Sequence, residues 1–528
     1  MKYLKKFENH TQYESYIATD FAKPNVSYCV TEGDVHYNPI PHDYSEDYLT
    51  FVALESGTFT LTIGSAVSQS ILSSISYSTD GGETWNTTNN VNSQTVTITT
   101  PTISEGEKVL WKGSGTGVST TINNSNRPST SSIFSSSGEF NVEGNIMSLI
   151  YGDDFSDEDS VEGTYNFALL FYSYNMPDTA KVVSAKNMVL PIDNVTTCCY
   201  FRMFQSCPLL EEAPSSIDAT SIGASGCMST FWTCPSLTTA PELPATTLSD
   251  LSYKAMFEGC SALTKSPSVI SASSIGISAC NTMFSGCTSL TTAPELPATT
   301  LANYCYQTMF NGCTSLTTAP ELPATTLGRG CYQNMFKGCT SLTTAPELPA
   351  ETLANECYVS MFYGCISLET APELPATTLA NNCYSSMFYN CSSLTTAPEL
   401  PATTLANNCY SYMFYNCSSL TAAPELPATT LTNSCYTYMF YGCTSLTTAP
   451  VLPATTLAPS CYNYMFNGCT SLNYIKAMFT TTPSNSYTSS WVSGVSDTGT
   501  FVKNAAATWT TTGNNGIPTG WTVETASE

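Results

Sequence analysis

Charged side chains are scarce in this 528-residue chain, and basic side chains are the scarcer kind. Only 11% of the residues are charged, with 16 Lys and Arg against 41 Asp and Glu, and the formal net charge is −25. An acidic surface repels the phosphate backbone of nucleic acids, so we expect no nucleic-acid partner. The chain also lacks any run of eighteen apolar residues, so we expect no membrane insertion.

Histidine is scarcer still. The three histidines are His10, His36 and His42, all within the first 45 residues. The rest of the chain therefore has no imidazole to serve as a general base or to activate a nucleophile. We expect no enzymatic activity, no cofactor and no metal site. A glycan-acting enzyme with a repeat appendage is a weak alternative, which would require two carboxyl groups paired within residues 46–150.

The N-terminal segment lacks the apolar stretch of a secretory signal. Basic residues in the first six positions are followed by polar and aromatic ones. We expect either a processed chain or, as Met1 favours, a protein that reaches its destination without classical secretion. Residues 1–45 instead have the pattern of a small module. A capped helix is predicted at residues 9–18, and two short strands at 26–30 and 35–37 flank a turn at Glu32, Gly33 and Asp34, as in a hairpin.

Residues 46–150 have the pattern of an all-β domain. Short strand candidates lie at residues 51–54, 58–63, 74–77, 95–100 and 108–111. Short strands at this spacing are typical of a sandwich-like fold. We expect residues 151–186 to form an N-terminal cap for a repeat region, and residues 476–528 to form a C-terminal cap with its own small core around Trp491, Trp509 and Trp521.

Between these caps, residues 187–475 repeat. Aligned on a Met-Phe pair, the sequence shows eleven units spaced by 26 residues, with two 27-residue steps near the start. One unit carries Thr230 and Phe231 in place of the pair. The other pairs begin at Met203, Met256, Met283, Met309, Met335, Met361, Met387, Met413, Met439 and Met465. Such repeats predict a solenoid, in which stacked units bury a continuous core.

Each unit contains the segment Cys-Tyr-x-x-Met-Phe-x-x-Cys, numbered here from position 0 to position 8. Positions 0, 1, 4, 5 and 8 are apolar or aromatic, whereas positions 2, 3, 6 and 7 are mostly polar. At 100° per residue the apolar positions fall on one face of a helix. We therefore predict a short helix with Cys, Met and Phe facing inward.

A proline-containing segment completes each unit and should form its strand side. Leu290, Ala293 and Leu296 are the inward candidates in one unit. Pro294 recurs one unit later as Pro320, and proline has no N–H to donate to a ladder. We expect a strand of two to four residues that stops bonding at the first proline. The overall prediction is a modular protein of β and α/β architecture.

The 23 cysteines follow the repeat. Cys305 and Cys313 lie eight residues apart, farther than paired zinc ligands usually lie, and on one helical face they would also be beyond disulfide reach. We expect columns of free buried thiols. The acidic cluster at residues 153–159 is interpreted as a solvated loop or a cation site. The glutamates of the proline segments form either a solvated edge or a column that attracts cations, at Glu295, Glu321, Glu347, Glu373, Glu399 and Glu425.

The repeat resembles a known family. The pattern Phe-x-x-Cys-x-Ser-Leu-Thr, as in residues 310–317, is similar to the BspA-like leucine-rich repeats of bacterial surface proteins, with Met-Phe where that family usually has Ala-Phe. The resemblance implies a leucine-rich-repeat-type solenoid and a role in adhesion and in protein or glycan binding. It brings no catalytic residues.

The first module resembles another group of proteins. Residues 3–7, 24–28 and 35–39 are similar to an N-terminal module of virion and tail proteins of phages of gut anaerobes. This resemblance implies a fibre or decoration protein on the virion surface, joined to other virion proteins through residues 1–45 and contacting a host-surface protein or glycan. The alternative is a BspA-like adhesin on a bacterial cell surface. Homo-oligomerisation stays open.

Tyrosines at the outward positions 3 and 6 are the candidate ligand-binding residues. Most units carry small polar residues there, but the last five carry tyrosine. The structural interpretation is that these surface tyrosines pack on one another. The functional interpretation is a patch that contacts a glycan or protein. The candidates are Tyr363, Tyr389, Tyr412, Tyr415, Tyr438, Tyr441 and Tyr464.

Overall fold

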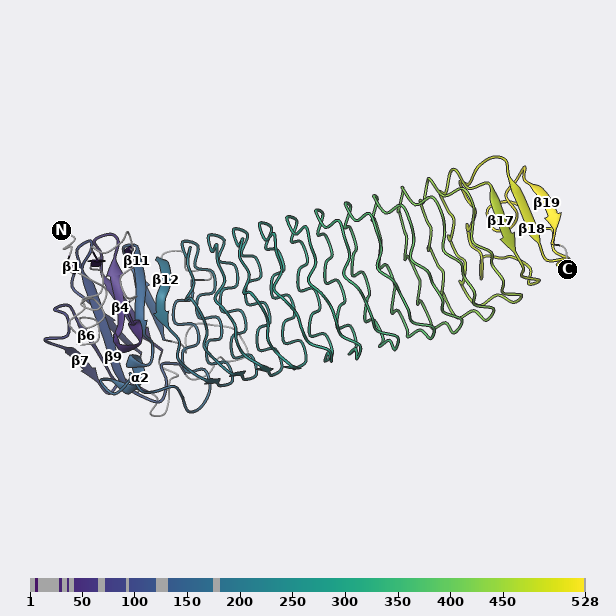
Figure 1. The fold of residues 1–528 in the computed structure, drawn as a ribbon. Coiled ribbons are helices and arrows are strands. Elements are labelled where there is room, and N and C mark those ends of the chain that lie inside the picture. The colour runs from purple at the N-terminus through teal and green to yellow at the C-terminus, as the bar shows by residue number, and fades with distance from the viewer. Residues whose placement is uncertain are drawn as a thin grey trace.

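The computed structural model is a long stack of coils that continues from a β-rich block at the N-terminal end (Figure 1). It describes residues 5–7, 28–30, 36–37, 42–64, 72–91, 95–119, 132–173 and 181–526. The predicted solenoid with 26-residue spacing and the β-rich region before it are both confirmed. No helix in these ranges is long and apolar enough to cross a membrane.

Three short strands are described in the first module. β1 (Lys5–Phe7) is parallel to β2 (Tyr28–Val30), and β2 pairs antiparallel with β3 (His36–Tyr37). The β2–β3 pair corresponds to the expected hairpin. The helix expected at residues 9–18 lies outside the described residues.

Two sheets face each other in the next region. The five expected strands are present as β4 (Leu49–Ala53), β5 (Phe59–Ile63), β6 (Leu72–Ser78), β8 (Val96–Thr99) and β9 (Lys108–Gly115). Strands that we did not anticipate are β7 (Asn86–Asn89), β10 (Ile133–Ser136), β11 (Phe140–Asn145) and β12 (Val182–Val189). A 3-10 turn η1 (Tyr44–Glu46) and a short helix α2 (Ser148–Tyr151) accompany them.

The sheets pack as a sandwich around aromatic side chains. One sheet has the order β12-β11-β4-β9-β6-β7 and the other β10-β5-β8. Phe51 of β4 lies 5.4 Å from Phe59 of β5 and 4.8 Å from Phe134 of β10, measured between ring centroids. These rings therefore fill the space between the sheets.

Strand β12 joins the sandwich to the solenoid. It pairs parallel with β11, and its Ser184 also bridges Glu212 in the first expected coil. The ring of Phe171 stacks on Phe134 at 5.8 Å and on Phe204 at 4.9 Å. The segment before the expected solenoid therefore forms a coil of its own, and the hydrophobic core continues from the sandwich into the stack.

The solenoid has about 13 turns, which corrects our count of eleven. One ring of each turn lies in a central column, with ring centroids 4.9–5.8 Å apart and planes within 10° for successive phenylalanines. Alignment on Met-Phe missed the two end turns, because Phe171 follows a leucine and Trp491 replaces phenylalanine. The column consists of Phe171, Phe204, Phe231, Phe257, Phe284, Phe310, Phe336, Phe362, Phe388, Phe414, Phe440, Phe466 and Trp491.

The predicted repeat helix is wrong. In the coil at residues 304–313, backbone N–H groups alternate between two kinds of partner. Tyr306, Thr308 and Phe310 donate to carbonyls of the next coil at 2.8–3.0 Å. The residues between them donate to the carbonyl three residues earlier, as Met309 does to Tyr306 at 3.3 Å. The segment is thus a run of turns bonded to its neighbours, and not an α-helix.

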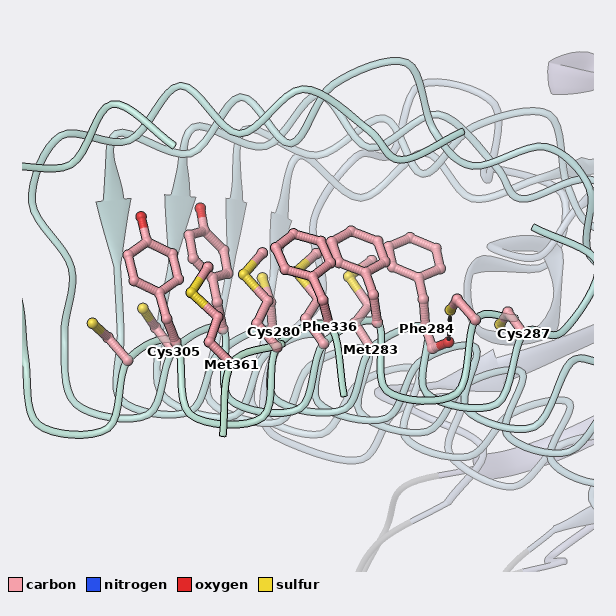
Figure 2. Close-up of a cluster of buried hydrophobic side chains, with 14 of the residues drawn as sticks. Cys280, Met283, Phe284, Cys287, Cys305, Phe336 and Met361 are labelled. Atoms are coloured by element: carbon pink, nitrogen blue, oxygen red, sulfur yellow. Dashed lines mark hydrogen bonds between the residues drawn. The ribbon is translucent and has the colours of Figure 1, made fainter. Parts of the chain in front are cut away.

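A left-handed residue every fourth position produces this path. The φ angle is 58° at Tyr304, 60° at Thr308 and 73° at Gly312, and the pattern recurs in the other coils. Over only nine residues, a backbone path that repeats every four residues brings the same positions inward as an α-helix, which repeats every 3.6 residues. Positions 0, 1, 4, 5 and 8 are accordingly buried, and Figure 2 shows this interior with Phe284 and Phe336 in one column and Met283 and Met361 in another.

The strand side also differs from our expectation. Before the prolines, Thr292 and Thr318 form only an isolated bridge. The two-residue strands lie after the prolines, just before the turn segment, in the early coils only. Leu290 and Leu296 are buried, as expected, while Ala293 is half-buried. The strands are β13 (Asn194–Val195), β14 (Ser221–Ile222), β15 (Thr247–Leu248) and β16 (Ser274–Ile275).

The repeat cysteines are free and buried. All 22 cysteines whose side chains the structure describes are in this state. The position-8 thiols donate to the phenylalanine carbonyl of the preceding coil, as Cys313 does to Phe284 at 3.1 Å. Burial raises the pKa of thiols such as Cys365 to about 12, so at neutral pH they are protonated, packed groups.

The C-terminal segment continues the stack. β17 (Tyr474–Ala477), β18 (Thr500–Lys503) and β19 (Thr522–Thr525) are parallel. Trp491 donates its indole N–H to Gly516 at 2.9 Å and contacts Phe466 of the central column at 6.1 Å. Trp509 and Trp521 belong to the same core. The tryptophans therefore close the end of the solenoid, where we had expected a cap with a separate core.

Substitution of Gly364 tests the four-residue path. Its φ is 74°, and an added Cβ would meet nothing closer than 3.9 Å, so only backbone conformation opposes a side chain there. Because left-handed φ is costly for β-branched residues, we expect Gly364→Val to lower the free energy of unfolding by about 1–2 kcal/mol. The matched control is Gly364→Asn, since Asn390 and Asn416 occupy this position in the next coils. Equal stability of both variants in urea denaturation would contradict the assigned path.

Candidate functional site

The seven candidate tyrosines lie on the outer side of the turn segment, and the structure brings all of them together. Those at position 6 form a long column of Tyr363, Tyr389, Tyr415 and Tyr441. Those at position 3 form a short column of Tyr412, Tyr438 and Tyr464. We call the two columns together the tyrosine double column.

Rings within each column lie face to face. Successive centroids of the long column are 4.4, 4.3 and 4.5 Å apart, with planes within 5°. Those of the short column are 4.6 and 4.4 Å apart. Contacts of 5.8–6.3 Å join the columns. The double column is therefore one continuous aromatic cluster over five coils.

The backbone directs these side chains outward. Tyr412, Tyr438 and Tyr464 occupy the left-handed position of their coils, with φ of 59°, 57° and 55°. This conformation costs about 1–2 kcal/mol for a residue with a side chain. Stacking with neighbouring rings contributes about 0.5–1.5 kcal/mol per pair and offsets that cost.

The column ends differ in what covers them. The Lys337 ammonium lies 4.7 Å from the Tyr363 centroid, which closes the first face of the long column. At the other end the next coil carries Asn467, and the short column is flanked by Ser386 and Ser490. Only these end positions leave a ring face without an aromatic neighbour.

Stacking changes what the tyrosines can offer to a ligand. Inside each column both ring faces are covered by the neighbouring rings, so no flat face is free there to stack on a sugar or a side chain. All seven side chains are half-buried. The ring edges and the hydroxyl groups are the parts that reach solvent, and they form two parallel rows along the solenoid.

The hydroxyls of Tyr389 and Tyr438 are neutral at physiological pH. Burial, and secondly the neighbouring tyrosines, raise the pKa of Tyr389 and of Tyr438 to about 12. Residues 338–475 contain no Lys, Arg or His. The surface can therefore donate and accept hydrogen bonds, and its ring edges carry partial positive charge, but it offers no basic side chain of its own beyond Lys337.

Asp153 and His42 are occupied by local contacts, whereas the column of glutamates is exposed. Asp153 of the acidic cluster accepts hydrogen bonds from the Tyr48 hydroxyl and the Lys112 ammonium, both at 2.6 Å. His42 lies 2.5 Å from Asp47. Glu295 and the glutamates aligned with it are exposed. Within the described ranges, no three His, Cys, Asp or Glu side chains are grouped so as to hold a metal ion.

One surface feature was not predicted from the sequence. A groove on the proline side of the first coils is lined by Lys186, Glu212, Glu242 and Lys265, among others. Lys265 stands where most later coils carry threonine. This departure from the repeat was the sequence feature from which the groove could have been predicted.

Comparison with known families supports the repeat assignment. The model described as BspA type leucine rich repeat region matches in six copies, over residues 253–395, 331–446 and 358–491. BspA-type leucine-rich repeats are therefore present, and the matched residues include the whole double column. No curated protein matches the chain significantly. The resemblance of residues 1–45 to phage proteins is not shown by these comparisons.

Titration of the tyrosines tests the burial of the double column. A tyrosine whose pKa is raised on folding stabilises the fold fully below its unfolded value of about 10, and this contribution is lost as the pH rises through the folded value. We expect ring-labelled ¹³C NMR to show Tyr389 and Tyr438 titrating near pH 12, with Tyr389→Phe and Tyr438→Phe identifying the two signals. Titration of both signals near pH 10 would mean that the rings are unstacked and exposed to solvent.

Proposed function

We propose that this protein is a non-enzymatic binding protein of a phage virion that contacts a host-surface protein or glycan through the tyrosine double column. The BspA-type repeats themselves suggest surface adhesion or protein binding. The finer proposal, which names the surface and the virion, rests on the arrangement of the tyrosine rings and on residues 1–45.

The observation that carries the proposal is the double column itself. At positions 3 and 6 most other coils present small polar residues, such as Thr308 and Asn311. The core does not need tyrosine at these positions, because the coils that lack it stack equally well on the same phenylalanine column. Seven in-register rings therefore form a surface beyond what the fold requires.

The geometry favours a ligand that is contacted at ring edges and hydroxyls. Tyrosine provides contact area with little rotamer entropy to lose, and stacking holds these rings in place before binding. A row of hydroxyls spaced by one coil suits a partner with many polar groups along its length. Both a glycan chain and an extended protein surface have this property.

Replacing Tyr412, Tyr415, Tyr438 and Tyr441 by phenylalanine tests the site. Phenylalanine keeps the stacked rings and removes only the hydroxyls, so thermal stability should change little. We expect binding to host cells to fall at least about tenfold, since four hydrogen-bonding groups are lost at about 1 kcal/mol each.

The matched control replaces Tyr304 and Tyr487, which lie on the solenoid outside the double column, by phenylalanine. This control should bind like the unmodified protein. Full binding by the fourfold variant would show that the double column is packing alone, and the β domain at residues 46–150 would then become the better candidate.

The virion assignment rests on the resemblance of residues 1–45 and on their small β1-β2-β3 sheet, whose outer edges could pair with a neighbouring protein. We expect mass spectrometry to find the chain in purified virions, and deletion of residues 1–45 to abolish its incorporation. Virions that lack the protein would contradict this assignment.

A bacterial cell-surface adhesin is the second candidate. The family match favours it, because the repeats resemble those of bacterial surface proteins. Protease shaving of intact cells that produce the protein distinguishes the two, since it releases solenoid peptides only if the protein is displayed on the cell.

A further inference from the structure

A second surface, distant along the chain from the double column, has the properties of a ligand site. A groove of 740 Å³ runs along the proline side of the first coils, from Lys186 to Ala293. Its volume lies within the range typical of small-molecule sites. Its residues belong to separate coils, so the site exists only in the assembled stack.

Proline creates the groove. On one side, Glu212, Thr239 and Lys265 form a ladder of bridges across three coils. On the other side, Ser216 bridges Glu242 in a second ladder. Between the ladders lie prolines such as Pro214 and Pro267, which line the groove and have no N–H to pair, so bridging between the coils is interrupted there.

The charged side chains of the groove differ in whether they already have a hydrogen-bond or ion-pair partner. Glu212 accepts from Lys186 at 3.3 Å and from Ser184 at 2.7 Å. Glu242 accepts from the N–H and hydroxyl of Ser268, at 3.0 and 2.7 Å. Lys265, by contrast, has no ion-pair or hydrogen-bond partner for its ammonium among the described residues.

The remaining lining is suited to a sugar. Thr239, Ser215 and Thr292 present exposed side-chain hydroxyls, and Ala213 and Ala240 contribute an apolar floor. Hydroxyl groups over an apolar floor match the two kinds of surface that a sugar ring exposes. An ammonium without a partner adds a preference for an anionic group.

We propose that this groove binds a carboxylate-bearing saccharide, with the Lys265 ammonium paired to the sugar carboxylate. The coil sequence agrees with this assignment. Most later coils carry threonine in place of Lys265 and glutamate in place of Ser268, so this coil gains a cation and lacks an anion relative to them. The proposal does not depend on the tyrosine double column.

Isothermal titration calorimetry of the full chain with oligogalacturonate tests the proposal. We expect Lys265→Thr, which restores the residue of the later coils, to weaken binding at least about tenfold. The matched control is Lys254→Thr, which removes the same charge from the turn side of the same coil and should leave binding unchanged. The fourfold tyrosine variant should also bind normally.

Chemically matched ligands complete the experiment. Methyl-esterified oligogalacturonate, which lacks the charge, should bind at least about tenfold more weakly than the free acid. Equal binding of the ester, equal loss in both lysine variants, or the absence of binding would overturn the proposal. Tighter binding of an oligo-aspartate peptide would also overturn it and would assign the groove to acidic protein segments.

Discussion

The bonding of every second backbone N–H to the next coil is the constraint on which this structure depends. Because each of these N–H groups donates to the residue just before its equivalent in the next coil, the hydrogen bonds hold the coils in register. Each position of the repeat then becomes a column along the solenoid. Phenylalanines stack on phenylalanines at 4.9–5.8 Å, and thiols follow thiols. The same register continues through β12 into the sandwich, so the sandwich and the solenoid share one continuous core.

Columns also determine what the surface can do. A tyrosine repeated after 26 residues must stack on its predecessor, which covers the ring faces and leaves the edges and hydroxyls exposed. A proline repeated at the same interval interrupts the ladder in most coils and lines a groove on that side of the solenoid. Both candidate binding surfaces thus result from repetition. Departures from the repeat, such as Lys265, give each surface its local chemistry.

Much of the fold could be predicted from the sequence, because burial follows position in the unit. The inward set exemplified by Cys305, Tyr306 and Phe310 was right. The helix was wrong, because nine residues do not distinguish a period of four from 3.6. Glycine or asparagine at position 7, as in Gly312 and Asn390, was the overlooked sign of left-handed turns. Phe171 and Trp491 were missed because neither follows methionine.

The candidate site was predicted only in part. Recurrence of tyrosine at outward positions identified all seven residues, but the covering of their faces depends on the close approach of successive coils. Nitration with tetranitromethane tests most directly whether this surface contacts the host. We expect the cell envelope of the host, added to the protein, to protect Tyr412, Tyr415, Tyr438 and Tyr441 from nitration. Tyr304 and Tyr487 should stay unprotected. Equal nitration of the four tyrosines with and without envelope would contradict binding through the double column.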